Sequence, residues 1–97
     1  MDATIVREAI IEGAQKYGYY VQNPIGPWTI VWTKDVDDNA RELVIKVEYE
    51  PNKVTIIAPK QTIRSYEEKH LDVAARFCRV YISLKAAQDR IKKPVLT

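Results

Sequence analysis

The sequence predicts an α+β domain in which a short N-terminal helix and a long C-terminal helix pack against a three-stranded antiparallel meander. Two observations carry this prediction. Apolar residues recur at helical spacing near both ends of the 97-residue chain, and they alternate with polar residues in its middle. The connections are short, and no internal repeat or low-complexity segment interrupts them. We therefore expect a single domain over residues 1–97 with the element order α-β-β-β-α.

The first helix is predicted over residues 2–17. Asp2 suits the N-cap position, and Gly18 follows the last periodic residue as a C-terminal stop. One face of this helix carries its small and apolar residues, namely Val6, Ala9, Ile10, Gly13, Ala14 and Tyr17. Residues 19–27 are rich in Pro, Gly and Asn, so we expect them to cross the surface without regular structure.

Three strands are predicted over residues 28–33, 42–49 and 54–58, because apolar and polar residues alternate there with a period of two. The face expected to be buried consists of Trp28, Ile30, Trp32, Leu43, Ile45, Val47, Tyr49, Val54, Ile56 and Ala58. The opposite face is expected to carry a small aliphatic cluster of Val31, Val44 and Ile57. Such a sheet has one buried face and one face that is half exposed.

The connection between the second and third strands predicts their register. Pro51 and Asn52 stand at the central positions of a four-residue segment and suit a type I turn. With these two residues as the loop, Tyr49 lies opposite Val54, and the apolar residues of both strands share one face. This agreement between the turn and the alternation indicates a β-meander.

The long helix is predicted to begin at a capping box, Ser65 to Glu68, and to end before Pro94. One stripe with unbroken 4-3-4-3 spacing is expected to face inward: Tyr66, His70, Val73, Phe77, Val80, Leu84, Ala87 and Ile91. A second apolar stripe, on roughly the opposite side, consists of Leu71, Ala75, Cys78 and Ile82. A helix that is apolar on two sides is either deeply buried or holds a second partner.

This helix is also longer than the strands beside it. About 28 residues at 1.5 Å each span about 40 Å, whereas the strands span about 20–27 Å, so the last turns are expected to overhang the sheet. The overhang and the second stripe together predict a homodimer. Its contact would involve Leu71, Ala75, Cys78 and Ile82, or the overhanging Leu84, Ala87 and Ile91. The substitution Ile82→Glu is then expected to split the dimer and to leave the fold largely intact.

The C-terminal region is basic. Residues 60–97 carry nine Lys or Arg against four Asp or Glu, a net charge of +5, whereas residues 1–59 carry six against nine, a net −3. A solvated helix surface with cations near its C-terminal end accounts for this charge. An acidic protein partner fits the same charge. The alternative function is nucleic-acid binding through phosphate contacts of low sequence specificity, made by Arg76, Arg79, Arg90, Lys92 and Lys93.

Two further features bear on nucleic acid. Trp28 and Trp32 are residues of the type on which single strands stack, but we expect them in the core, under the helices. The element order is similar to that of double-stranded RNA-binding domains, which carry a Gly-Pro-x-His loop and a Lys-Lys-x-Ala-Lys start to the second helix. Here residues 34–40 form an acidic loop, and the helix starts Ser-Tyr-Glu-Glu-Lys at 65–69. We therefore infer no membership of that family.

The sequence holds no arrangement typical of catalysis. His70 and Cys78 are eight positions apart on one helix, about 12 Å along its axis, which is too far for a nucleophile–base pair. Residues 35–40 begin like a calcium loop, but Ala40 replaces the required glycine and Lys46 the required glutamate. We expect a non-enzymatic protein with no cofactor and no metal site.

The start of the chain lacks the pattern of a signal peptide, and no apolar run approaches the length of a membrane span. The single cysteine cannot form an internal disulfide, which is typical of a reducing compartment. We expect a cytoplasmic protein without membrane contact. The preferred function is a small self-associating module that acts in macromolecular interaction or as a structural element.

Overall fold

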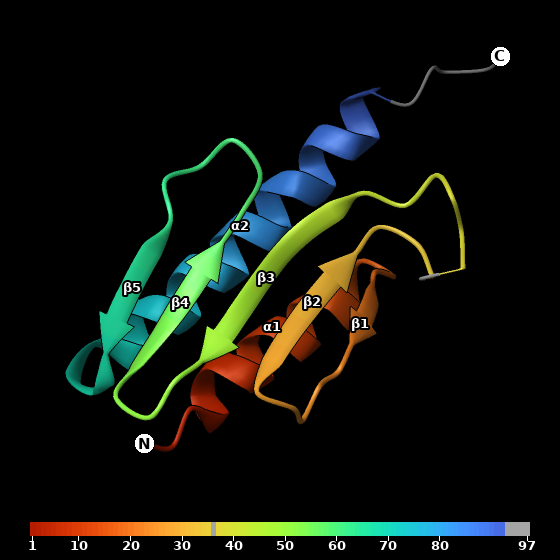
Figure 1. The fold of residues 1–97 in the computed structure, drawn as a ribbon. Helices are drawn as coiled ribbons and strands as arrows, with labels where there is room; N and C mark the ends of the chain where they lie inside the picture. The colour runs from red at the N-terminus through yellow and green to blue at the C-terminus, as the bar shows by residue number, and fades with distance from the viewer. Residues whose placement is uncertain (36, 93–97) are drawn as a thin grey trace, which may run out of the picture.

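The computed structural model describes residues 1–35 and 37–92 and confirms the α+β class. It contains two helices and one antiparallel sheet of five strands (Figure 1). The elements, in chain order, are α1 (Thr4–Lys16), β1 (Tyr20–Gln22), β2 (Trp28–Trp32), β3 (Leu43–Tyr49), β4 (Lys53–Ile57), β5 (Arg64–Glu67) and α2 (Leu71–Lys92). A 3-10 turn, Glu68–His70, joins β5 to α2. The strands follow each other across the sheet in chain order.

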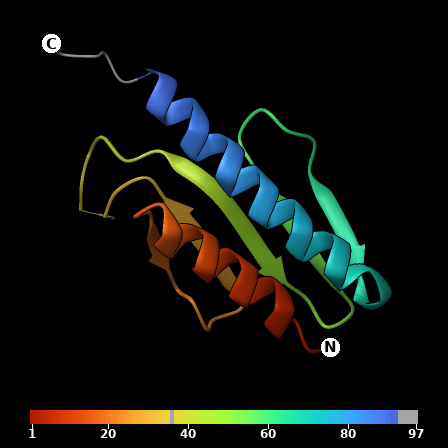
Figure 2. The same cartoon turned by 180° about the vertical axis from the view of Figure 1, so that it is seen from behind.

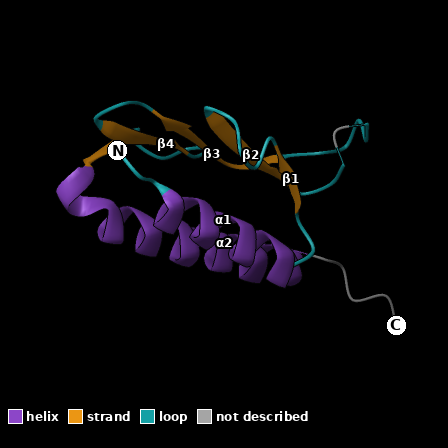
Figure 3. Cartoon of the chain, turned by 90° about the horizontal axis from the view of Figure 1, so that it is seen from below, coloured by secondary structure: helices purple, strands orange, loops and turns teal. Residues whose placement is uncertain are grey.

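Both helices lie on one face of the sheet, and no helix of the described residues covers the other face (Figure 3). The helices α1 and α2 run side by side in the same direction (Figure 2). The hydroxyl of Tyr17 near the end of α1 donates a hydrogen bond to Ser83 Oγ at 3.1 Å. None of the described helices is long and apolar enough to cross a membrane.

The sheet has two more strands than predicted, and both are edge strands. β1 has three residues and lies in the segment predicted to be an irregular crossing, where so short a stretch shows no alternation. β5 occupies the predicted capping box, and its Ser65 pairs with Thr55 of β4. Most residues of β5 are polar and exposed, which is typical of an edge strand but gives no alternating pattern. The α-helix therefore begins later than predicted, at Leu71.

The predicted register of the β3–β4 hairpin is confirmed. Tyr49 pairs with Val54 and Val47 with Ile56, both as the Pro51-Asn52 turn requires. The hairpin is closed by a hydrogen bond of 2.9 Å from the Glu50 N–H to the carbonyl of Lys53. Local sequence was sufficient here because the turn and both strands are contiguous.

The facing of β2 is opposite to the predicted one. Val31 pairs with Ile45 and Thr29 pairs with Val47, and directly paired side chains share a face of the sheet. Ile45 and Val47 belong to the core beneath the helices, so Thr29 and Val31 are buried with them. The alternate residues of β2 therefore lie on the open face: Trp28, Ile30 and Trp32.

Contacts between strands explain this facing. The register of β2 on β3 shifts after Val31, which leaves Val44 without a partner on β2 and lets it enter the core. The buried hydroxyl of Thr29 donates to the carbonyl of Asn23 at 3.2 Å and accepts from the Tyr49 hydroxyl at 3.2 Å. Two of the three predicted members of the outer aliphatic cluster, Val31 and Val44, are thus core residues.

The two apolar stripes of α2 are also exchanged relative to the prediction. The buried stripe is the one expected to be free, and it includes Leu71, Ala75, Cys78 and Ile82. Small residues at Ala74, Ala75 and Cys78 let α2 approach the sheet and α1 closely. On α1 the matching residue is Gly13, where an added Cβ would lie 3.2 Å from Ile82 Cδ1. This close fit, and not the regularity of the apolar spacing, decides which stripe faces inward.

Candidate interaction surface on α2

An exposed apolar stripe runs along the side of α2 that faces away from the sheet. This stripe, the outer seam, consists of Val73, Phe77, Val80, Leu84, Ala87 and Ile91. Four of its members are exposed to different degrees: Val73 (41%), Val80 (51%), Leu84 (57%) and Ile91 (83%). Exposed aliphatic residues are normal when scattered singly, whereas a contiguous exposed apolar patch is a candidate interaction surface.

On the side of β5, the outer seam includes the ring of Phe77 and borders that of Tyr81. The rings of Phe77 and Tyr81 stack with centroids 5.9 Å apart and an interplanar angle of 18°. The guanidinium carbon of Arg64, on β5, lies 4.5 Å from the centroid of the Phe77 ring. Because two neighbours pack against its ring, Phe77 is held in one orientation. The aromatic side of the seam therefore has a fixed shape before any partner binds.

On the side of α1 the seam borders a groove of about 450 Å³ between the two helices. Val80 and Leu84 line the groove from α2, and Glu12 and Tyr17 line it from α1. Arg79 reaches across to Glu12 with an N–O distance of 4.0 Å. Both charged side chains are more than half exposed, so this ion pair adds little to stability.

The structure divides the predicted dimer contact into two groups. The first is buried in the core, where the sheet and α1 already cover it, and comprises Leu71, Ala75, Cys78 and Ile82. A second chain cannot reach these side chains in the folded protein, so this half of the predicted interface is corrected. The second group belongs to the outer seam and comprises Leu84, Ala87 and Ile91.

The basic row predicted on α2 is described in part. Three of its members are exposed and lie on the α1 side of the outer seam: Arg76, Arg79 and Arg90. The others fall outside the described part of the structure: the side chain of Lys92 and the whole of Lys93. Glu12 of α1 adds a carboxylate to the row through its ion pair with Arg79, which lowers the net positive charge of this side.

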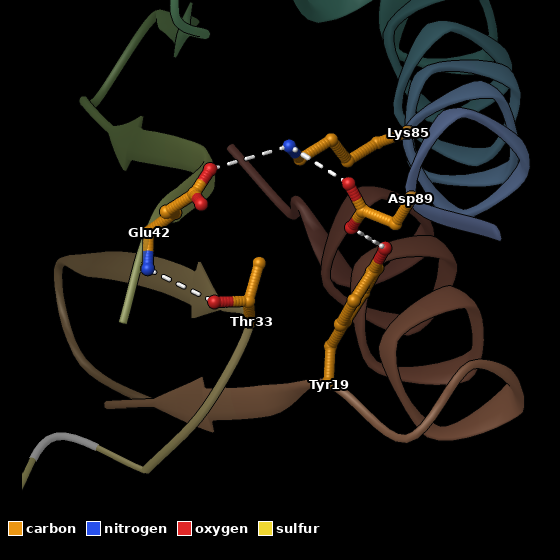
Figure 4. A network of polar contacts seen from close by, with 5 residues as sticks. All are labelled: Tyr19, Thr33, Glu42, Lys85 and Asp89. Atoms are coloured by element: carbon orange, nitrogen blue, oxygen red, sulfur yellow. Dashed lines mark hydrogen bonds and ion pairs between the residues drawn. The ribbon is translucent and has the colours of Figure 1, made fainter. Parts of the chain in front are cut away.

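A polar network ties the C-terminal half of α2 to the sheet (Figure 4). Lys85 Nζ lies 3.1 Å from Asp89 Oδ1 and 3.5 Å from Glu42 Oε2. The hydroxyl of Tyr19 donates a hydrogen bond of 3.0 Å to the other carboxylate oxygen of Asp89. The N–H of Glu42 donates to Thr33 Oγ1 at 2.9 Å, so the residues that flank β1, β2 and β3 all join the network.

The electrostatics of this network keep its protons in place. Burial opposes the positive charge of Lys85, but the hydrogen bond to Asp89 and the charges of Asp89 and Glu42 outweigh it and raise the pKa of Lys85. Burial, followed by the hydrogen bond to Asp89, raises the pKa of Tyr19 well above its ordinary value. At neutral pH neither group is therefore poised to act as a base or a nucleophile.

A cleft of about 730 Å³ adjoins the network, between the end of α1, the β2–β3 connection and α2. Tyr19, Glu42 and Asp89 line it. Their polar atoms are already engaged with one another or with Lys85. The network therefore acts as a clamp on α2.

The residues considered for chemistry are not brought together. Cys78 is fully buried, and burial raises the pKa of its thiol to about 12, so it does not form a thiolate at neutral pH. His70 is exposed at the end of the 3-10 turn that precedes α2. Within residues 1–35 and 37–92, no group of three or more His, Cys, Asp or Glu side chains is placed to hold a metal ion.

The tryptophans form a surface that the sequence did not predict. Trp28 and Trp32 lie on the open face of the sheet, each partly exposed. The indole N–H of Trp32 donates to Gln22 Oε1 at 2.8 Å, and the guanidinium carbon of Arg41 lies 4.2 Å from its ring centroid. The open face therefore has an aromatic edge held by a hydrogen bond and a cation–π contact.

The charges on this open face are balanced. Lys46 lies opposite Ile30 and forms an ion pair of 3.7 Å with Glu48. Lys53, on β4, forms one of 3.9 Å with Glu50. A surface that binds the nucleic-acid backbone carries an excess of positive charge. The aromatic edge thus lacks the electrostatic part of such a site, and the outer seam is the stronger candidate surface.

No family model, no curated protein and no solved structure was found to match this chain.

Proposed function

We propose that this protein is a small, non-enzymatic, self-associating interaction module whose contact surface is the outer seam of α2. The observation that carries the proposal is the exposure of Val73, Val80, Leu84 and Ile91 on one side of α2, where the partly exposed Phe77 and Ala87 connect them into one row. The described chain already buries the other apolar stripe of α2, so the row is not needed for its own core. A binding role also agrees with the buried thiol of Cys78 and the fully partnered Lys85.

The size of the seam limits the affinity of such a contact. Covering a half-exposed Val, Leu or Ile side chain is worth about 1 kcal/mol, roughly half the value for full burial. Four such residues on each of two copies give about 8 kcal/mol before any loss of translational and rotational freedom. Because about −8 kcal/mol corresponds to a Kd of about 1 μM, we expect an affinity no tighter than the micromolar range.

Solution mass is the direct test. Over a concentration series from tens of micromolar to millimolar, light scattering is expected to show a rising share of dimer for the wild-type protein. The substitution Leu84→Glu places a charge at the centre of the seam, so it is expected to give a folded monomer. Far-UV circular dichroism shows whether the variant keeps its helices and strands.

A matched control uses the same substitution elsewhere on the surface. Ile63, in the segment between β4 and β5, is 62% exposed and lies outside the seam. The variant Ile63→Glu is expected to remain dimeric. A wild-type protein that stays monomeric up to millimolar concentration, or a dimer that Leu84→Glu leaves intact, would show that the outer seam is not the contact surface.

Nucleic-acid binding by the basic row is the second candidate. The exposure of Arg76, Arg79 and Arg90 on one side of α2 favours it, since guanidinium groups in a row can contact successive phosphates. Glu12, paired with Arg79, works against it. The tryptophans do not reinforce this row, because they lie on the open face of the sheet and the row lies in the helix layer.

This candidate predicts an affinity for generic DNA or RNA that falls steeply as salt is raised. The double substitution Arg76→Ala and Arg90→Ala should weaken it and reduce the salt dependence. Lys60→Ala, which removes an exposed cation in the β4–β5 segment, is the control. Absence of binding at low salt, or binding that salt does not change, rejects nucleic acid as the partner of the basic row.

A further inference from the structure

We propose that two copies of this chain pair through their outer seams with their α2 helices parallel, so that each seam residue meets its own counterpart. The inference rests on the proposed function, which requires self-association but no particular orientation. It names a second copy as the occupant of the seam and places the two-fold axis along α2.

The outer seam has the spacing of one strand of a coiled coil. Its residues form two sets in which members are seven positions apart: Val73, Val80 and Ala87, and Phe77, Leu84 and Ile91. Two helices with such sets interlock their side chains along a shared 3.5-residue repeat. From Val73 to Ile91 the seam covers 18 steps of the helix, about 27 Å. A self-pair can therefore form along most of α2.

An antiparallel pair brings like charges together. The antiparallel register that covers the whole seam sets Val73 of one copy against Ile91 of the other, which puts Arg76 beside the second copy's Arg90. Symmetry repeats this contact at the other end. Both arginines are exposed cations, so two repulsive contacts oppose this orientation. A shifted register avoids the repulsion but leaves Val73 or Ile91 uncovered.

A parallel pair brings the same arginine to an uncharged neighbour. Residues that flank a parallel seam meet partners five positions further along, so Arg76 faces Tyr81 of the second copy and Ser83 faces its Gln88. The Tyr81 ring is already fixed by stacking on Phe77, and it offers the guanidinium a cation–π contact. The borders of the seam therefore complement each other in the parallel orientation and repel each other in the antiparallel one.

Disulfide trapping tests the orientation. In a parallel pair the two copies of Val73→Cys lie opposite each other, so mild oxidation is expected to give a covalent dimer. The variant Ile91→Cys should do the same at the other end of the seam. In an antiparallel pair each of these residues lies about 27 Å from its own counterpart. A covalent dimer then forms only in a mixture of Val73→Cys with Ile91→Cys.

Two controls show whether a covalent dimer reports the pairing. The native Cys78 is buried, so wild-type protein should remain uncrosslinked. Ile63→Cys introduces an exposed thiol away from the seam and should crosslink poorly. Crosslinking in the mixture only, with a dimer still seen by light scattering, overturns the parallel orientation and retains self-association. Crosslinking of Ile63→Cys as strong as that of Val73→Cys also overturns the parallel orientation. A monomer by light scattering removes the proposed function itself.

Discussion

The contact between α1 and α2 can be tested by a pair of size-changing substitutions. A Cβ added at Gly13 would lie 3.2 Å from Cδ1 of Ile82 and 3.5 Å from its Cγ2. The first distance is shorter than an optimal carbon–carbon contact of about 3.5–4.0 Å, and the second is within that range. The substitution Ile82→Val removes Cδ1. The effect of Gly13→Ala should therefore depend on which residue occupies position 82.

The expected magnitudes follow from three terms. In the wild-type background, Gly13→Ala gains about 1 kcal/mol in helix propensity and loses about 1–3 kcal/mol to overpacking. The net result is a loss of between about 0 and 2 kcal/mol. Ile82→Val alone costs about 0.5–1.5 kcal/mol. In the Ile82→Val background the close contact is gone, so Gly13→Ala is expected to stabilise the protein by about 1 kcal/mol, which gives a coupling of about 1–3 kcal/mol.

Urea unfolding of the four proteins, followed by circular dichroism, measures this coupling. Low protein concentration keeps self-association out of the free energies. If Gly13→Ala changes the free energy of unfolding equally in both backgrounds, within about 0.5 kcal/mol, then Ile82 does not pack on Gly13. That result would refute the assignment of the Ile82 stripe to the core.

Three further predictions concern the core and the clamp on α2. The substitution Ile82→Glu is expected to unfold the protein instead of splitting a dimer, because it leaves a charge in the core; a folded monomer would contradict this. Stability is expected to fall as pH rises above about 9.0, because the thiol of Cys78 ionises near 9.0 in the unfolded chain, whereas burial raises its pKa to about 12 in the folded protein. Between these two pH values the folded protein keeps a thiol proton that the unfolded chain has lost, so a rise in pH favours unfolding. The urea midpoint of Cys78→Ala should therefore decline less steeply with pH than that of the wild type. Asp89→Ala removes the acceptor of Tyr19 and one partner of Lys85, and should cost about 1 kcal/mol. Hydrogen exchange should become faster in the last turns of α2, and an unchanged exchange pattern would show that the network does not clamp the helix.

The sequence predicts which segments are helices and strands better than it predicts their inner faces. The Pro51-Asn52 turn links β3 directly to β4, so local spacing was enough for their register. No such tight turn joins β2 to β3. The facing of β2 depends instead on the displaced Val44 and on hydrogen-bond partners for Thr29. Those partners are 6 and 20 positions away in the chain. Local alternation carries no information about them.

The same reasoning applies to α2 and its candidate site. The unbroken 4-3-4-3 spacing predicts an inward face, but the structure leaves Val73, Val80, Leu84 and Ile91 of that stripe exposed. A helix that covers a sheet buries a broad stripe, whereas a narrow seam is typical of a coiled coil. The stripe of α2 that faces the sheet is broad, because the consecutive residues Ala74 and Ala75 are both buried. The fit of Ile82 against Gly13 and the contact between Tyr19 and Asp89 join opposite ends of the chain. Neither can be read from local spacing.

The position of the tryptophans has an optical consequence. Both indoles, Trp28 and Trp32, lie on the open face, and the outer seam lies in the helix layer on the other side of the sheet. Intrinsic fluorescence of the folded protein therefore reports on the solvent and on Arg41 at the open face. A chain that docks on α2 leaves the emission unchanged, whereas one that covers the sheet shifts it. The protein thus carries a natural spectroscopic label that distinguishes its two sides.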